Sequence, residues 1–128
     1  MNGGLPNHIL VVDDHVVARR IIMRILDQAG YDVTGVGSGM EALDVFQRER
    51  VDLAILDIGM PEIDGFTLLR MLRELPDGSN LPVIMLTASG RDEDVYAARA
   101  AHVDHFLTKP SSSQIIMQTV RDLLEGRA

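Results

Sequence analysis

Five polar side chains of this sequence stand directly after apolar stretches, at positions where they could do chemistry together. Asp13 and Asp14 follow the run HILVV, and Asp57 follows LAIL. Thr87 follows VIML, and Lys109 ends the segment HFLTK. Each has an ordinary alternative, because an aspartate after a strand commonly caps a helix or forms a turn, and a loop lysine is commonly solvated. Their joint chemistry depends on whether the fold gathers them.

Short β-type runs alternate with helical patterns along the chain. We expect strands at residues 8–12, 31–36, 51–56, 81–86 and 104–108. We expect helices at residues 16–29, from Ser38 to about 50, from 64 or 65 onward, at about 92–101, and from Ser112 or Ser113 onward. Alternating βα units predict an α/β fold, here a doubly wound (βα)5 parallel sheet with strand order 2-1-3-4-5.

Such a sheet brings the five polar side chains to one edge. The carboxyl ends of parallel strands lie together, and ligands bind there at the switch point between strands 1 and 3. Three carboxylates in one place repel one another unless a cation neutralises them, and oxygen ligands without cysteine favour Mg²⁺. A cation, a lysine and a hydroxyl beside Asp57 would form a clamp for a phosphoryl group, which a carboxylate can accept.

Four segments carry a resemblance to a known family: ILVVDDH, LAILDIGMPEIDGF, VIMLTAS and FLTKP. In this order and separation they resemble the receiver domain of two-component response regulators, over about residues 8–125. The resemblance implies a flavodoxin-like fold and a cytoplasmic signalling switch that is not an enzyme, although it assists its own phosphorylation and dephosphorylation. From the residues themselves we expect a flexible arm at 1–7, which leaves residues 8–128 for the receiver domain.

The resemblance also implies a role for each site residue. Asp57 would accept the phosphoryl group from the histidine of a kinase or phosphotransfer protein, and Lys109 would pair with that group. Asp14 would bind Mg²⁺ directly, with Asp57 as a further ligand. Asp13 would hold the metal, commonly through water, and the backbone carbonyl of Gly59 would complete the set.

A conformational switch is the second implication. Thr87 would donate its hydroxyl to a phosphoryl oxygen, and Phe106 would turn inward as Thr87 moves. The surface that responds would consist of the helix at about 92–101, the strand at 104–108 and the last helix. Phe106 has no hydroxyl, so its inward form would depend on packing.

Composition restricts the partners. The net charge of −7, with 12 basic against 19 acidic residues, argues against direct nucleic-acid binding by this chain. It has no cysteine and no apolar run of the length that spans a bilayer, which is about 20 residues. Val16, Arg20 and Met23 fall outside the apolar stripe of the first helix, so we interpret them as a docking patch for a kinase or phosphotransfer helix, with isolated exposed residues as the alternative.

Other interpretations remain open at this point. The active form could be a homodimer, and an output domain could follow Ala128 in a longer regulator. A phosphohydrolase of the haloacid dehalogenase type would need a second aspartate where Gly59 stands. A flavin-binding module would need a glycine- and hydroxyl-rich loop after the first strand, where Asp13 and Asp14 would repel a phosphate. A receiver-like domain that never takes phosphate is a further alternative.

Overall fold

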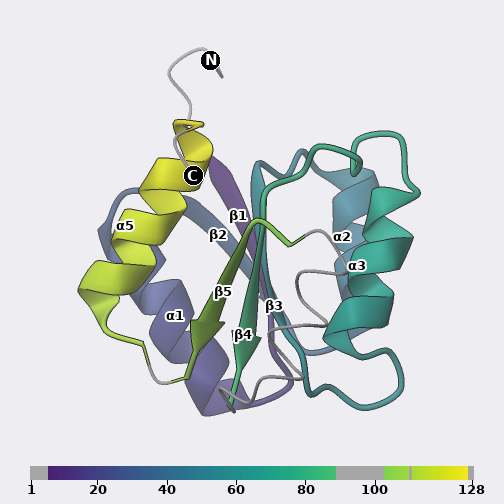
Figure 1. The fold of residues 1–128 in the computed structure, drawn as a ribbon, viewed down its shortest axis with the longest axis horizontal. Coiled ribbons are helices and arrows are strands. Elements are labelled where there is room, and N and C mark those ends of the chain that lie inside the picture. The colour runs from purple at the N-terminus through teal and green to yellow at the C-terminus, as the bar shows by residue number, and fades with distance from the viewer. Residues whose placement is uncertain (1–5, 89–102, 110, 127–128) are drawn as a thin grey trace.

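The computed structural model describes residues 6–88, 103–109 and 111–126. Within them, five parallel strands form one sheet in the order β2-β1-β3-β4-β5, between two layers of helices (Figure 1). The strands are β1 (His8–Val12), β2 (Asp32–Val36), β3 (Leu53–Asp57), β4 (Val83–Thr87) and β5 (His105–Thr108). The described helices are α1 (Val16–Gln28), α2 (Gly39–Arg48), α3 (Gly65–Arg73) and α5 (Ser113–Leu124). The predicted architecture and strand order are confirmed.

Alternating side chains of the strands build two separate cores. In β1, Ile9 and Val11 pack with α1 and α5, whereas Leu10 and Val12 pack with α2 and α3. Every residue of β1, β3 and β4 is buried, as expected for inner strands covered on both faces. The three strands whose ends carry Asp13, Asp57 and Thr87 are therefore the most firmly held part of the sheet.

Polar caps begin the helices where the sequence indicates. Ser38, Asp64 and Ser112 each accept a hydrogen bond from the backbone N–H three residues ahead, at 3.2, 2.8 and 3.1 Å. Gly30 follows the end of α1 with φ of 96°, a conformation that glycine adopts without steric cost. These turns set where each helix begins or ends relative to the strand beside it.

Four strands begin later than expected: β2 and β5 by one residue, and β3 and β4 by two. β3 begins at Leu53 rather than 51 and includes Asp57, while β4 begins at Val83, after Pro82, and includes Thr87. Proline cannot donate a ladder hydrogen bond, which explains the later start of β4. The helix expected at about 92–101 lies outside the described residues, as do most of the residues of the expected arm.

The chain enters and leaves the described fold at the same edge of the sheet. β1 begins at His8 and α5 ends at Leu124, both at the amino edge, opposite the carboxyl ends of the strands (Figure 1). The carbonyl of Asn7 accepts a hydrogen bond from the N–H of Asp32. The chain therefore already pairs with β2 at the residue before β1. None of the described helices has the length and apolar character needed to cross a membrane.

Candidate functional site

Four of the predicted site residues lie at the carboxyl edge of the sheet. Asp13 follows β1 directly, Asp57 ends β3, Thr87 ends β4 and Lys109 follows β5. The register pairs Asp57 with Leu86, so Asp57 stands in a central strand between two hydrogen-bonded neighbours. A side chain at the end of such a strand is held by packing on both sheet faces, which limits its freedom to move.

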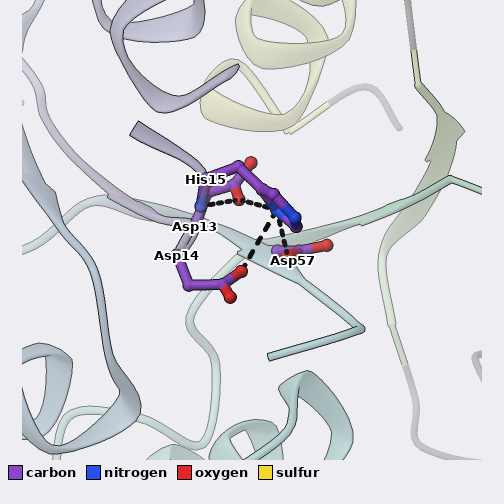
Figure 2. Close-up of side chains that lie close together, drawn as sticks. All are labelled: Asp13, Asp14, His15 and Asp57. Atoms are coloured by element: carbon purple, nitrogen blue, oxygen red, sulfur yellow. Dashed lines mark hydrogen bonds and ion pairs between the residues drawn. The ribbon is translucent and has the colours of Figure 1, made fainter. Parts of the chain in front are cut away.

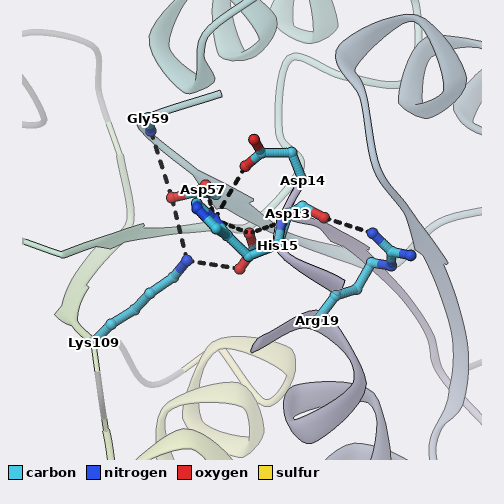
Figure 3. A network of polar contacts seen from close by, with 7 residues as sticks. All are labelled: Asp13, Asp14, His15, Arg19, Asp57, Gly59 and Lys109. Atoms are coloured by element: carbon cyan, nitrogen blue, oxygen red, sulfur yellow. Dashed lines mark hydrogen bonds and ion pairs between the residues drawn. The ribbon is translucent and has the colours of Figure 1, made fainter. Parts of the chain in front are cut away.

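Lys109 connects two of these carboxylates. Its Nζ donates a hydrogen bond to Asp13 Oδ2 at 2.7 Å and lies 3.5 Å from Asp57 Oδ1 (Figure 3). The side chains of Asp13 and Asp57 are 0% and 5% exposed, so water screens this arrangement weakly. One positive charge therefore faces two buried carboxylates.

The two carboxylates respond in opposite directions. Burial raises the pKa of Asp57 above its ordinary value, and the negative charge of Asp13 raises it further, while Lys109 and the Gly59 N–H offset only part of this effect. Burial also acts to raise the pKa of Asp13, but Lys109 and the N–H and ring of His15 outweigh it, so the pKa of Asp13 is lowered. Lys109 thus stabilises mainly the charged form of Asp13. At Asp57, the nearby positive charge does not offset the effects of burial and of the Asp13 charge.

Two carboxylate oxygens at the site lack hydrogen bonds. Asp14 Oδ1 and Asp57 Oδ2 are buried without a hydrogen-bond partner among the residues that the structure describes. The backbone N–H of Gly59 donates to the other oxygen of Asp57, Oδ1, at 3.4 Å. Buried polar atoms are normally satisfied, so these two oxygens indicate a place for a positive group.

The acidic pair and Asp57 meet in one cluster, and a histidine joins them. Asp13, Asp14, His15 and Asp57 each offer one ligand atom, and these four atoms lie within 4.8 Å of one another (Figure 2). The predicted convergence of the three carboxylates is therefore present. The histidine was not predicted as part of the site, although it directly follows the two aspartates in the sequence.

Arg19 is a second residue that the sequence analysis missed. Its Nη1 donates to the backbone carbonyl of Asp13 at 2.8 Å, from one turn into α1 (Figure 3). This bond ties the loop after β1 to the helix that follows it. Arg19 therefore positions the backbone of Asp13. Within the described residues, it forms no hydrogen bond or ion pair with a carboxylate of the site.

The loop after β3 folds tightly against the site. The N–H of Gly65 donates to the carbonyl of Ile58 at 3.0 Å, which closes the loop. A Cβ on Gly65 would lie 2.5 Å from the carbonyl oxygen of Asp57, so only glycine fits without displacing that strand end. Between them, Glu62 has φ of 64°, a left-handed conformation that costs a non-glycine residue roughly 1 kcal/mol.

The two predicted switch residues stand on the neighbouring strands β4 and β5. Thr87 is buried at the end of β4, and its carbonyl accepts a hydrogen bond from the Lys109 N–H at 2.6 Å. Phe106 is half-buried in β5, opposite Met85, and packs against the core on the α2 and α3 side. Residues 89–102, which connect β4 toward β5, lie outside the described residues.

Comparison with known proteins identifies the chain. A family model described as the response regulator receiver domain matches residues 9–121. The chain belongs to this family. The receiver is 40% identical over 123 residues to the transcriptional regulatory protein GlrR of Escherichia coli strain K12, covering 96% of this chain but 27% of GlrR. It is 44% identical over 102 residues to an uncharacterized 14.6 kDa protein of Leptolyngbya boryana, covering 80% of this chain and 78% of that protein.

Solved structures agree with the fold. The crystal structure of a putative response regulator from Chloroflexus aurantiacus J-10-fl superimposes with a TM-score of 0.90 at 34% identity, covering 94% of this receiver and 98% of that chain. The strand order and the five-stranded parallel sheet are thus those of receiver domains. The resemblance inferred from the four sequence segments is confirmed.

The docking patch expected on the first helix of the receiver needs a correction. Met23 is half-buried and packs against the core between α1 and the sheet, where a Cβ on Gly35 would collide with its sulfur. The other two predicted residues, Val16 and Arg20, are exposed, Val16 at 46%, and the exposed apolar residues Val17 and Ile21, at 72% and 55%, lie on the same helix. The exposed apolar surface therefore lies on α1, as expected, but Met23 is not part of it.

Proposed function

We propose that this receiver domain is a phosphoacceptor switch in which Asp57 takes a phosphoryl group from the histidine of a kinase or phosphotransfer protein. The observation that carries the proposal is the position of the Asp57 carboxylate. It is 5% exposed and lies 3.5 Å from the only lysine of the chain, beside the acidic pair, whose Asp13 contacts the same lysine. A carboxylate that is fixed by a central strand and flanked by cation sites is suited to nucleophilic attack on phosphorus.

The two carboxylate oxygens of Asp57 have different surroundings and would have different roles. Oδ1 faces Lys109 and the Gly59 N–H, so a phosphoryl group bonded to Oδ1 would lie beside both donors. The new O–P bond forms as the P–N bond of the donor phosphohistidine breaks, and the donor imidazole keeps the electron pair and takes up a proton. Lys109 and the N–H then stabilise charge on the phosphoryl oxygens, which is most of what phosphoryl transfer requires.

The acidic cluster suits a divalent cation, and we propose that Mg²⁺ binds there during phosphorylation. Asp13, Asp14, Asp57 and the backbone carbonyl of Gly59 would hold it, and the orphaned oxygens of Asp14 and Asp57 are the atoms that a hard cation would satisfy. Bound there, Mg²⁺ would neutralise negative charge on the carboxylates and the incoming phosphoryl group. The residues of the chain supply the remaining contacts.

The proposed readout is a rearrangement at the far side of the sheet. The backbone hydrogen bond from the Lys109 N–H to the Thr87 carbonyl joins the ends of β4 and β5. A phosphoryl group that attracts the Lys109 ammonium and the Thr87 hydroxyl would therefore act on both strands. Phe106 lies on β5 two residues before Thr108, the partner of Thr87, and would change its packing. This change would alter the surface of β5, α5 and the helix expected at about 92–101. That surface would bind a downstream partner, a fused output domain or a second copy.

Partner docking is proposed for the exposed surface of α1. Val16, Val17 and Ile21 surround the start of the helix that follows the acidic pair, and Arg20 is exposed beside them. A partner helix packed on these residues would lie next to the loop that carries Asp13 and Asp14. This position would bring a donor histidine toward Asp57.

Phosphorylation with a small acyl phosphate tests the proposal. Intact-mass measurement should show one added phosphoryl group on the wild-type chain with Mg²⁺, and little without it. Asp57→Asn should take none, whereas Asp44→Asn should behave as wild type, because Asp44 is an exposed α2 residue paired with Arg48. Equal labelling of the wild type and Asp57→Asn would refute the assignment of the phosphoacceptor.

A further inference from the structure

His15 stands at the acidic cluster, with Nδ1 of its ring facing the carboxylates while the side chain is 67% exposed. Its Nδ1 lies 3.2 Å from Asp13 Oδ1, 3.2 Å from Asp14 Oδ1 and 3.8 Å from Asp57 Oδ2 (Figure 2). The residue occupies the N-cap of α1, yet its side chain makes no capping hydrogen bond. The ring is therefore directed at the three carboxylates rather than at the helix.

The four side chains have the spacing of a common ligand sphere. Their ligand atoms lie within 4.8 Å of one another, close to the roughly 4–5 Å that separates opposite ligands of one divalent ion. A second observation points to a ligand independently of this spacing. Asp57, whose side chain is 5% exposed, directs Oδ2 into the cluster, and that oxygen has no hydrogen-bond partner within the described part of the chain.

The nitrogen donor changes which ion such a site prefers. Mg²⁺ prefers oxygen ligands and gains little from an imidazole, whereas imidazole is a good ligand for Zn²⁺ and other later transition metals. Three carboxylates alone would be a site for a hard ion. Three carboxylates and one imidazole form a mixed oxygen and nitrogen set that also suits ions of the borderline class.

We propose that His15 is a fourth protein ligand of the cation site, through Nδ1, and that it gives this receiver a higher affinity for Zn²⁺ and Co²⁺ than its carboxylates alone provide. The inference rests on the metal site of the proposed function and adds an ion selectivity to it. These ions compete with Mg²⁺ for the carboxylates beside Asp57. Their binding therefore excludes Mg²⁺ from the position that the proposed phosphorylation requires.

Calorimetric titration of the whole chain with Mg²⁺ and with Zn²⁺ tests this selectivity. His15→Ala should weaken Zn²⁺ binding at least about tenfold, the lower end of the loss seen even for partners outside the ligand sphere. Its Mg²⁺ affinity should stay within about twofold of wild type, because the lost ligand is a neutral nitrogen. The substitution keeps the backbone N–H that donates to Asp13 Oδ1 at 2.9 Å, so the carboxylate retains that bond.

Two further variants separate ligation from other effects. His15→Asn retains a polar side chain but lacks the imidazole nitrogen, and it should not restore Zn²⁺ affinity. His105→Ala removes an exposed histidine at the start of β5, at the opposite edge of the sheet, and should bind Zn²⁺ as the wild type does. The visible absorption spectrum of the Co²⁺ complex should change in His15→Ala and stay unchanged in His105→Ala, because it reports the ligand atoms.

The possible outcomes distinguish this inference from the proposed function. If His15→Ala keeps the wild-type ratio of Zn²⁺ to Mg²⁺ affinity and the same Co²⁺ spectrum, the ring only hydrogen-bonds to Asp13 and the inference fails, while Mg²⁺-dependent phosphorylation stands. An equal loss of Zn²⁺ affinity in His105→Ala would also overturn it. If neither ion binds the wild type, both the inference and the proposed metal site fail.

Discussion

Lys109 Nζ lies 2.7 Å from Asp13 Oδ2, although β3 and β4 separate the strands that carry these two residues. The lysine side chain therefore runs along the carboxyl edge, past Asp57, to reach the end of β1. Lys109 is also the only lysine of the chain, so no other lysine can take its place. This contact makes Lys109 both the counter-ion of the acidic pair and the nearest cation to Asp57.

Lys109→Met should separate these two roles. We expect phosphorylation by a small acyl phosphate to slow by roughly 10–100-fold, because a charge-assisted hydrogen bond is worth about 1.5–3 kcal/mol. We expect Mg²⁺ to bind more tightly than in the wild type, because an ammonium no longer competes for Asp13. Rates from intact-mass time courses and affinities from calorimetry measure the two effects. Weaker Mg²⁺ binding in the variant would contradict this account.

Asp57→Asn should stabilise the fold at neutral pH when divalent cations are removed. The pKa of Asp57 is raised above 3.8 by burial and by the charge of Asp13. The folded chain therefore binds this proton more tightly than the unfolded chain, and stability falls as pH rises from 3.8 through the raised pKa. The thermal midpoint of Asp57→Asn should exceed that of the wild type above this range, and the difference should vanish as pH falls to 3.8.

Asp13→Asn provides the matched control, with the opposite sign. Although burial opposes it, the contacts with Lys109 and His15 hold the pKa of Asp13 below 3.8. Its stabilisation is fully present above 3.8 and is lost as pH falls through the lowered pKa. Asp13→Asn should thus lower the midpoint at neutral pH, with a smaller loss in acid. Equal shifts of the same sign in both variants would show that the two carboxylates do not differ in this way.

Gly65 and Gly59 form a second matched pair beside the site. A Cβ on Gly65 would lie 2.5 Å from the Asp57 carbonyl oxygen, whereas one on Gly59 would meet nothing within 4 Å. We expect Gly65→Ala to lower the free energy of unfolding by about 1–3 kcal/mol and to slow phosphorylation of Asp57, since the strand end must shift. Gly59→Ala should change stability by less than about 0.5 kcal/mol. Urea unfolding measures both, and equal stability of the two variants would refute the close-contact argument.

The exposed surface of α1 should matter only for a protein donor. Val17→Ser combined with Ile21→Ser should slow phosphotransfer at least about tenfold from a purified kinase that phosphorylates the wild type, because anchors of this kind contribute more than ~1 kcal/mol. Labelling by a small acyl phosphate should be unchanged. Met40→Ser is the control, because Met40 is 63% exposed on α2, on the other face of the sheet. An unchanged kinase rate in the double variant would exclude this surface as the docking site.

Much of the fold and the site followed from sequence pattern, for physical reasons visible in particular residues. The apolar runs are buried on both faces, so their order determined the sheet, and the carboxyl edge had to gather Asp13, Asp57 and Lys109. Met23 was wrongly predicted to be exposed. The helical period gives the direction in which a residue points from the helix axis, but not how much of the helix the sheet covers. Gly35 leaves room for the Met23 side chain there, which a pattern of one helix does not reveal.

The role of His15 could not be predicted for a different reason. Its position after two aspartates is typical of a helix start, and spacing does not reveal which side-chain rotamer an extended residue there adopts, here with φ of −86° and ψ of 108°. Arg19 is similar, because its bond to the Asp13 carbonyl depends on the distance between helix and loop. Contacts of this kind depend on tertiary geometry, and residue spacing alone does not determine them.

Because β1 starts and α5 ends at the amino edge of the sheet, the described fold begins and ends on the side opposite Asp57. A module linked just before β1 or just after α5 would therefore be attached at the edge away from the carboxylate that we propose as the phosphoacceptor. In that arrangement, the proposed entry point of the signal and the points of attachment lie on opposite edges of the sheet.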